Sequence, residues 1–420
     1  MSDNTRHTAG STTSTDPQKS RSLTRIETIR LSGLAAVIFV ILASYAVARP
    51  ATESLFIEEN GTSGLPMAWL AVALGSLLVV TIYNRFSATT DLIQIFGWVS
   101  AASAAILAVI LCCMELGIEG MTWWLYVWKD LYVVVLIEIF WSFANSTIPQ
   151  DKAKWWYGAF CVLGSLGGMA GNLGVGLLAV ASSPARSLWA VVPLLLIAWG
   201  GCVLLVRKAG VVATKSTSKP SLSGGFKVLA KSKALWLLML LIGTTQVAIT
   251  LVDYQFNIAI EAAYPDATDR TVAIGKVYAA IDFIAISLQM LTGPILRWIG
   301  VPIVLLAIPG VLGGAVAAYA LVPKYTAIAA AKVASKAFDY SLFRAAKEIL
   351  YIPLSHAERT QGKAFVDMMS YRMAKGATSL MLLSLVAPKR PGLALGLTIA
   401  SIAVWMVITI KLNRSHKQSA

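Results

Sequence analysis

Runs of about twenty apolar residues recur along the whole length of this 420-residue chain. A helix needs about 20 mostly apolar residues to cross a hydrocarbon core of about 30 Å. The composition agrees, because 57% of the residues are hydrophobic and only 13% are charged, whereas about 25% of the residues are charged in soluble domains. The mean hydropathy of +0.70 points the same way. We therefore predict an all-α, polytopic integral membrane protein embedded in a lipid bilayer.

Twelve runs long enough to span a membrane can be read from the sequence, six on each side of a polar and basic segment. The first six are centred on Leu31–Ala48, Pro66–Tyr83, Leu92–Cys113, Thr122–Ala144, Trp155–Ala179 and Leu188–Val206. The second six are centred on Ala234–Tyr254, Ile274–Leu296, Gly300–Val322, Tyr325–Leu342, Ala364–Val386 and Leu393–Ile410.

The segment between the two sets, residues 207–233, carries seven Lys or Arg residues together with Gly and Ser. Basic residues concentrate in cytoplasmic segments of membrane proteins, so we interpret it as a cytoplasmic linker. Residues 1–20 are rich in Ser and Thr and lack apolar content, which is typical of disorder. The expected divisions are a disordered cytoplasmic N-terminus (1–30), a six-helix bundle (31–206), the linker (207–233), a second six-helix bundle (234–411) and a cytoplasmic tail (412–420).

The formal net charge of +14 lies mostly in short segments between the apolar runs. Arg85 and Lys152 fall in connections on the same side as the linker, whereas Glu53, Glu58 and Glu59 fall in the first connection on the opposite side. This distribution predicts topology determinants and not a nucleic-acid surface. It places both termini in the cytoplasm, with the bacterial inner membrane as the expected location.

Two sets of six spans joined by a linker suggest two pseudo-symmetric halves, as in transporters of the major facilitator type. In that architecture the substrate site lies between the halves near the bilayer midplane. We expect the chain to act as a monomer.

Charged residues within the predicted spans are the main functional signal, because each costs roughly 2.5 kcal/mol or more at the bilayer centre. Lys332, Lys336 and Asp339 follow one another at helical spacing and share a face, which Lys347 extends if the helix continues. The alternative is an intrahelical pair of Lys336 with Asp339 that neutralises itself. That alternative leaves Lys332 unexplained.

A second charged face lies in VWKDLYVVVLIEIFWSFAN, residues 127–145. Asp130, Glu138, Trp141 and Asn145 fall within a sector of roughly 80° on a helix, whereas Lys129 points elsewhere and is expected to extend towards the lipid interface. Glu138 has no basic neighbour one turn away, so we predict a partner on another helix. It is also a candidate proton carrier.

Further charges complete the candidate site. Asp367 and Lys375 share a face of the span Ala364–Val386, from which Arg372 turns away; Arg49 ends the first span, and Asp253 lies at the outer end of the span Ala234–Tyr254. Together these cations favour a small anionic substrate. The candidate substrate-binding residues are Arg49, Asp130, Glu138, Asn145, Asp253, Lys332, Lys336, Asp339, Lys347, Glu348 and Lys375.

Other chemistries find little support in the sequence. The four cysteines and three histidines show no metal-ligand spacing, and no nucleophile–base set or Walker-type motif is present. We expect no metal, no cofactor and no enzyme activity. The glycines of the span Trp155–Ala179, including the pairs Gly164–Gly168 and Gly167–Gly171, have the spacing that lets helices pack closely.

Two blocks of sequence resemble the nucleotide exchangers, the ATP/ADP antiporter family of plastids and intracellular bacteria. IEIFWSFANSTIPQDKAKWWYGAFCVLGSLGG resembles the family's FWGFAN segment and the Gly-rich helix that follows it. KAFDYSLFRAAKEILYIPLSHAERTQGKAFVDMMSYRMAKGATSL resembles its KYSLFDPxKEMAYIPL, KVKGKAAIDV and GKSGG elements. The helix LLIGTTQVAITLVDYQF is similar to the family's NLVE-bearing helix.

This resemblance implies a twelve-helix major-facilitator fold and a nucleotide as substrate. It puts Lys347 and Glu348 on the family's KE pair, Asp253 on its helix 7 carboxylate and Arg49 on the Arg of its LRDTKD motif. That motif reads ARPATES here, so Thr52 replaces its Lys, and Lys129 replaces the helix 4 glutamate.

Three functions follow as hypotheses. The first is a secondary active transporter that moves a nucleotide or related phosphorylated anion by alternating access, as in ATP/ADP exchange. The second is a proton-coupled major-facilitator transporter of a different organic solute, with Glu138 or Asp130 as proton carrier. The third is a membrane enzyme or a non-transporting receptor subunit.

Overall fold

The computed structural model describes residues 25–87, 89–148, 150–209, 222–386 and 391–419, and it is helical with no strand among those residues. The N-terminal half contains α1 (Arg25–Asn60), α2 (Leu65–Phe86), α3 (Leu92–Glu115), α4 (Met121–Thr147), α5 (Gln150–Ala181), α6 (Pro184–Ser187) and α7 (Val191–Ala209). The C-terminal half contains α8 (Leu222–Lys231), α9 (Lys233–Ala263), α10 (Ala267–Trp298), α11 (Val301–Leu321), α12 (Tyr325–Phe338), α13 (Arg344–Leu350), α14 (Lys363–Met381) and α15 (Pro391–Ser419).

Each predicted span falls on helical residues, but several helices extend beyond it. α1 begins at Arg25 and continues through Pro50 to Asn60, so residues 25–30 are helical and Arg49 does not end the helix. Pro50 removes one backbone hydrogen bond, yet Pro50 and the residues after it, including Thr52 and Glu53, are buried, so tertiary packing sustains the helix. The expected assignment of Glu53, Glu58 and Glu59 to an outward loop is therefore wrong, because all three lie within α1.

The segments flanking the predicted bundles also contain helix. Residues 222–231 of the predicted linker form α8, and α15 extends into the predicted tail as far as Ser419. Residues 1–24, which make up most of the predicted disordered N-terminus, lie outside the described residues, as do linker residues 210–221.

Nine helices among the described residues are long and apolar enough to cross a membrane. α4, α12 and α14 are not among them, and these are the helices that carry Asp130, Lys332, Lys336 and Lys375. Each of the three lies against other long helices: α4 against α1, α2 and α3, α12 against α9, α10 and α11, and α14 against α2 and α9. Their charges therefore face protein and a cavity, as charge in a membrane requires.

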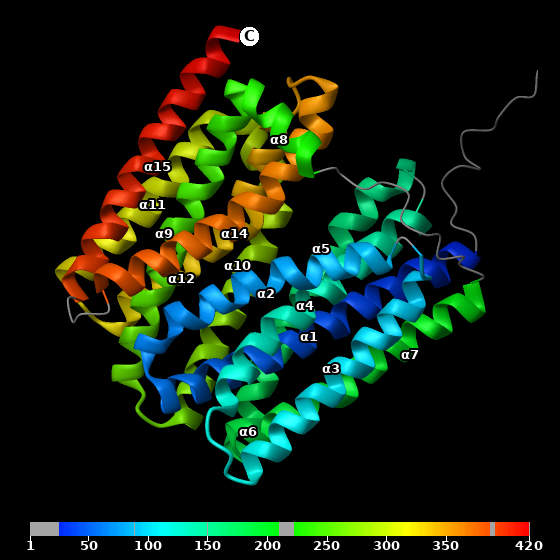
Figure 1. Ribbon diagram of the computed structural model, residues 1–420. Helices are drawn as coiled ribbons and strands as arrows, with labels where there is room; N and C mark the ends of the chain where they lie inside the picture. Colours follow the sequence, from blue (N-terminus) through cyan, green and yellow to red (C-terminus); the bar gives the residue numbers. More distant parts are fainter. Residues whose placement is uncertain (1–24, 88, 149, 210–221, 387–390, 420) are drawn as a thin grey trace, which may run out of the picture.

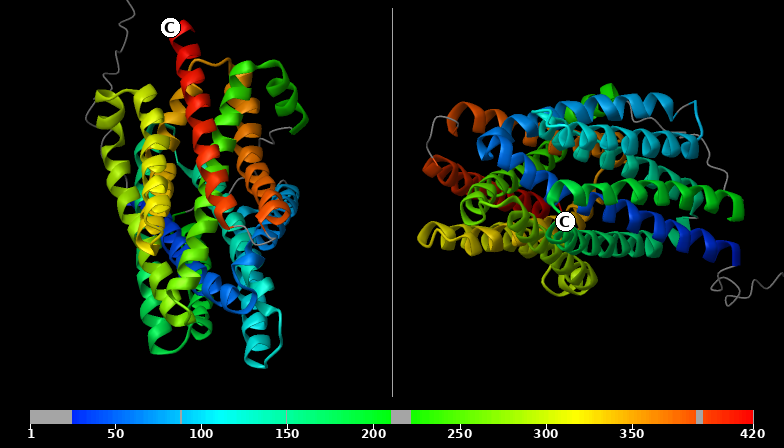
Figure 2. Two further views of the ribbon diagram at one scale, coloured as in Figure 1. Left: turned by 90° about the vertical axis from the view of Figure 1, so that its left-hand side faces the viewer. Right: turned by 90° about the horizontal axis from the view of Figure 1, so that it is seen from below.

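The hydrophobic core divides along the chain. One buried cluster comes from α1–α7 and a second from α8–α15, and Figures 1 and 2 show the corresponding groups of helices side by side. The two groups meet mainly where α10 packs on α5 and α1, and where α14 packs on α2. Two groups of helices about a central seam are the two-bundle arrangement that the sequence predicted.

One end of the seam between the halves is closed, at the end of α1 and the start of α10. A third buried cluster joins Phe56, Leu65 and Trp69 to Leu251 and Tyr254 across the seam.

Polar contacts reinforce this closed end. Ser54 Oγ donates to the carbonyl of Ala267 (2.7 Å), Arg270 Nη1 donates to the carbonyl of Ser54 (2.9 Å), and Thr62 Oγ1 donates to Glu261 Oε2 (2.6 Å). Asp266 caps α10, and the backbone N–H of Asp269 holds the pKa of its carboxyl below the ordinary value.

The glycines of α5 allow neighbouring helices to approach closely. A Cβ atom at Gly167 or Gly171 would collide with the backbone carbonyl of Phe39 or Ala43 on α1, and one at Gly168 would meet Asp282 on α10. The close packing predicted from the glycine spacing is thereby confirmed.

We expect Gly167→Ala to lower the melting temperature of the detergent-purified protein, because overpacking against rigid backbone costs about 1–3 kcal/mol. Gly174→Ala is the matched control, since nothing lies within 4 Å of a Cβ there and alanine is the better helix former. Equal melting temperatures for the two variants would contradict this account of the α1–α5 contact.

Candidate functional site

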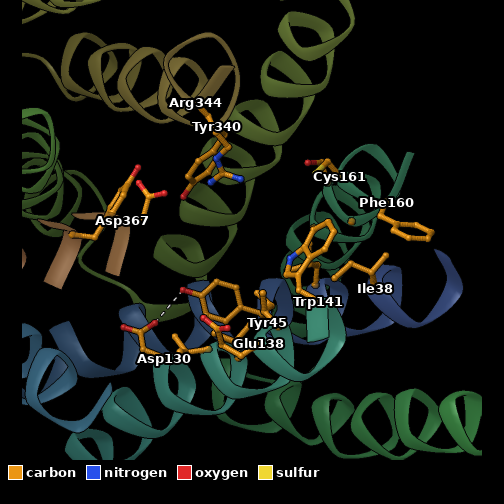
Figure 3. Close-up of a pocket in the computed structure, with 18 of the residues that line it drawn as sticks. Ile38, Tyr45, Asp130, Glu138, Trp141, Phe160, Cys161, Tyr340, Arg344 and Asp367 are labelled. Atoms are coloured by element: carbon orange, nitrogen blue, oxygen red, sulfur yellow. Dashed lines mark hydrogen bonds between the residues drawn. The ribbon is translucent and has the colours of Figure 1, made fainter. Parts of the chain in front are cut away.

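A cavity of about 2010 Å³ lies between the two halves (Figure 3). α1, α2, α4 and α5 line it on one side, and α10, α13, α14 and the turn between α12 and α13 line it on the other. It extends to Ser87, Tyr157 and Glu348, which lie near the helix ends remote from the closed end of the seam. The cavity is therefore shut at one end of the molecule and continues to the other.

Five of the eleven predicted site residues line this cavity, namely Arg49, Asp130, Glu138, Glu348 and Lys375. The other six lie outside its lining, namely Asn145, Asp253, Lys332, Lys336, Asp339 and Lys347.

Lys332, Lys336 and Asp253 form a buried ion cluster that joins α12 to α9. The carboxylate of Asp253 lies 2.8 Å from Lys336 Nζ and 3.6 Å from Lys332 Nζ. Lys332 is 1% exposed, with its ammonium 3.9 Å from the centroid of the Phe256 ring. Because α9 runs on to Ala263, Asp253 lies inside the helix, and its expected position at the outer end is wrong.

The alternative pairing of Lys336 with Asp339 does not form. Lys336 is paired with Asp253, and Asp339 instead accepts a hydrogen bond from Gln246 Nε2 (3.3 Å). Helical spacing allowed both partners for Lys336, and the packing of α9 against α12 selected the one on the neighbouring helix.

A π-helical turn at Asp339–Phe343 changes which residues after α12 face the cavity. Such a turn inserts an extra residue and rotates the helix that follows. Arg344 and Glu348 consequently line the cavity, whereas Lys347 is buried and pairs with Asp367 on α14 (Nζ–Oδ1 2.8 Å). The expected continuation of the Lys332–Lys336 face to Lys347 is therefore wrong, and Arg344 was missed because regular helical spacing does not anticipate the turn.

Asp130 on α4 is held by two donors. Tyr45 Oη donates to its Oδ1 (3.0 Å), and Lys129 Nζ lies 3.0 Å from the same oxygen. Lys129 is 1% exposed and stacks on the Tyr126 ring, so the expectation that it extends towards the lipid interface is wrong. Asn145, further along α4, accepts a hydrogen bond from Tyr157 Oη (2.5 Å) at the edge of the cavity.

Glu138 forms no ion pair with any residue that the structure describes, so the partner predicted for it on another helix is not seen at contact distance. The positive charge acting on it is that of Arg372 on α14, and both residues line the cavity. The expectation that Arg372 turns away from the site is therefore wrong.

Arg49 reaches the cavity from α1. Its guanidinium lies 3.3 Å from the centroid of the Tyr278 ring and 5.1 Å from that of Tyr45, and its Nε has no hydrogen-bond partner among the described residues. Tyr278 Oη donates in turn to Glu53, one helical turn after Arg49 (3.3 Å). Thr52, at the position of the family's lysine, is fully buried and does not line the cavity.

Three cations in the cavity lining have no carboxylate within ion-pair distance in the described part of the chain: Arg49, Arg344 and Lys375. Three of the five carboxylates in the lining are paired with a lysine, and Glu138 and Asp282 form no ion pair among the described residues. Asp130 is paired with Lys129, Asp367 with Lys347 and Glu348 with Lys363. The cavity therefore offers cationic donors that no carboxylate of the described chain neutralises, and guanidinium and ammonium groups bind phosphate and carboxylate well.

Asp282 is a cavity carboxylate that the sequence reasoning missed. It accepts a hydrogen bond from Asn172 Nδ2 (2.9 Å) across the α5–α10 seam. An acidic residue inside the predicted span Ile274–Leu296 was the available signal. Among the described residues, no group of three His, Cys, Asp or Glu side chains could hold a metal ion.

Comparisons with known sequences find relatives of this chain. Residues 201–416 match the family described as TLC ATP/ADP transporter. The chain is 26% identical over 343 residues to ADP,ATP carrier protein 1 of Chlamydia trachomatis, covering 69% of this chain and 64% of that protein. It is 26% identical over 301 residues to ADP,ATP carrier protein 5 of Rickettsia conorii, covering 60% of this chain and 59% of that protein. The chain thus spans less than two thirds of the length of these relatives.

Solved structures with the same fold are more distant in sequence. A bacterial homologue of the iron transporter ferroportin in an inward-facing state superposes with a TM-score of 0.67 at 15% identity, covering 93% of this chain and 99% of that chain. A mutant of the nucleoside transporter NupG superposes with a TM-score of 0.70 at 9% identity, covering 92% and 99%. These likenesses concern the fold alone. The family match covers half of the sequence, and this chain belongs to the TLC ATP/ADP transporter family.

Proposed function

We propose that this protein is a secondary active transporter that moves a nucleotide or a related phosphorylated anion across the membrane by alternating access, in the manner of ATP/ADP exchange. The observation that carries the proposal is the set of three cavity cations without an acidic partner in the described part of the chain, Arg49, Arg344 and Lys375. An anion with several negative charges would satisfy them together. The ADP,ATP carrier relatives support the same substrate class.

The shape of the cavity supports alternating access. Both halves line it, and it is closed at one end by the contacts of Ser54, Ala267 and Arg270. We propose that residues 31–206 and 234–411 act as the two moving bundles, with 207–233 as the linker. In this proposal the chain works as a monomer in the bacterial inner membrane with both termini in the cytoplasm, and the cavity faces the cytoplasm.

We expect Arg344→Ala and Lys375→Ala each to raise the KM for labelled ATP about 10- to 150-fold, because hydrogen bonds to charged groups contribute about 1.5–3 kcal/mol. The measurement is uptake into proteoliposomes with and without unlabelled nucleotide inside. Arg297→Ala is the matched control, since Arg297 is exposed and lies outside the cavity lining. Robust flux of a neutral solute without flux of any nucleotide would reject the proposal.

Proton-coupled transport of a different organic solute is the second candidate, and Asp282 is the observation that favours it. Its carboxylate lines the cavity with an amide as hydrogen-bond partner. Asp130, by contrast, is paired with Lys129. Asp282 is therefore better suited than Asp130 to take up and release a proton.

If proton coupling operates through Asp282, Asp282→Asn should abolish the dependence of uptake on an imposed pH gradient, because the amide cannot exchange a proton. The measurement is initial uptake rate with and without the gradient, with Glu119→Gln at an exposed loop position as control. An Asp282→Asn variant that still responds to the gradient like the unaltered protein would exclude this role.

A further inference from the structure

We infer that an aromatic platform formed by Trp141 and Tyr157 binds the planar base of the substrate, while the cavity cations bind its phosphates. The inference rests on the proposed function and extends it to a second part of the ligand. It identifies the substrate as an anion that also carries a flat heteroaromatic group.

The platform is held by packing from behind. The Trp141 and Tyr157 rings meet edge to face, with centroids 5.3 Å apart and planes at 71°. Phe140 packs on Trp141 at 5.4 Å and on Phe160 at 5.7 Å. Phe140 and Phe160 are buried, at 2% and 0% exposed, so they fix the two outer rings in place.

The outer rings themselves remain accessible. Trp141 and Tyr157 are half-buried and line the cavity, and Figure 3 shows the Trp141 side chain pointing into it, towards the side where Tyr340 and Arg344 lie. The Tyr157 hydroxyl is already engaged by Asn145. What these residues offer to a ligand is therefore mainly ring surface, on which a base can stack.

An interfacial aromatic belt is the simpler explanation for tryptophans in a membrane protein. The belt-like tryptophans of this chain differ from Trp141, however. Trp98 and Trp124 are 58% and 65% exposed and lie outside the cavity lining. Trp141 instead lies at the seam between the halves.

The platform and the cations belong mostly to opposite halves. Trp141 and Tyr157 come from α4 and α5, whereas Arg344 and Lys375 come from α13 and α14. Arg372 of α14 lines the same cavity as Trp141 and Tyr157. A nucleotide would therefore contact both halves at once, whereas a bare polyphosphate would engage only the cationic part.

The test measures binding of ATP, GTP, CTP and UTP, and of inorganic tripolyphosphate, to the purified full-length chain. Trp141→Leu and Tyr157→Leu should weaken the tightest nucleotide about 5- to 150-fold, the fold-change that corresponds to about 1–3 kcal/mol for stacking on one base. Binding of tripolyphosphate should stay within about twofold, which also reports that the variants are folded. Trp141→Phe should retain most of the nucleotide affinity, and Trp98→Leu all of it.

Two results would overturn the inference while leaving the proposed function intact. One is unchanged nucleotide affinity in the Trp141→Leu and Tyr157→Leu variants. The other is an equal loss of nucleotide and tripolyphosphate binding, which would make the platform a structural element. Failure of the unaltered protein to bind any of the five probes would overturn the proposed function itself.

Discussion

A charged side chain in the hydrocarbon region of a bilayer costs roughly 2.5–3.5 kcal/mol on insertion scales, and the architecture of this protein follows from how that cost is met. Three helices that carry charge in their interior, α4, α12 and α14, fall short of the length or apolarity expected of a membrane span. Their charges are paired across helices, as in the Asp253 cluster, or face the cavity, as Lys375 does. The bundle surrounds them with more apolar helices.

Charges that are paired across helices stabilise the fold, whereas charges that face the cavity remain available to a ligand. Lys332, Lys336 and Asp253 satisfy one another and hold α12 to α9. Arg49, Arg344 and Lys375 lack such a partner in the described part of the chain, so water or a ligand has to supply what the protein does not. The glycines of α5 also help to form the cavity. Because they lack side chains, α1 and α10 can pack closely against α5, and the two halves meet along this helix.

Much of the candidate site could be anticipated from charge in apolar runs. Asp130, Glu138 and Lys375 were predicted and line the cavity. Lys347 was predicted to face the site but is buried outside the cavity lining, and Arg344, which was not predicted, lines the cavity. The cause is the π-helical turn at Asp339–Phe343, because its irregular backbone leaves no clear signal in residue spacing. Asp253 was misplaced because α9 is longer than its apolar run, and its last turns are supported by packing.

The sequence by itself determined that this chain crosses a membrane many times, that it consists of two comparable halves and that unusual charge lies within its spans. These properties depend on composition and on short-range spacing, which a linear pattern records. The tertiary structure alone decided which charges neutralise one another, which remain free in the cavity and which end of the seam is closed. Those outcomes depend on contacts between residues far apart in the chain, such as Asp253 with Lys336 and Ser54 with Ala267, and helical periodicity carries no information about them.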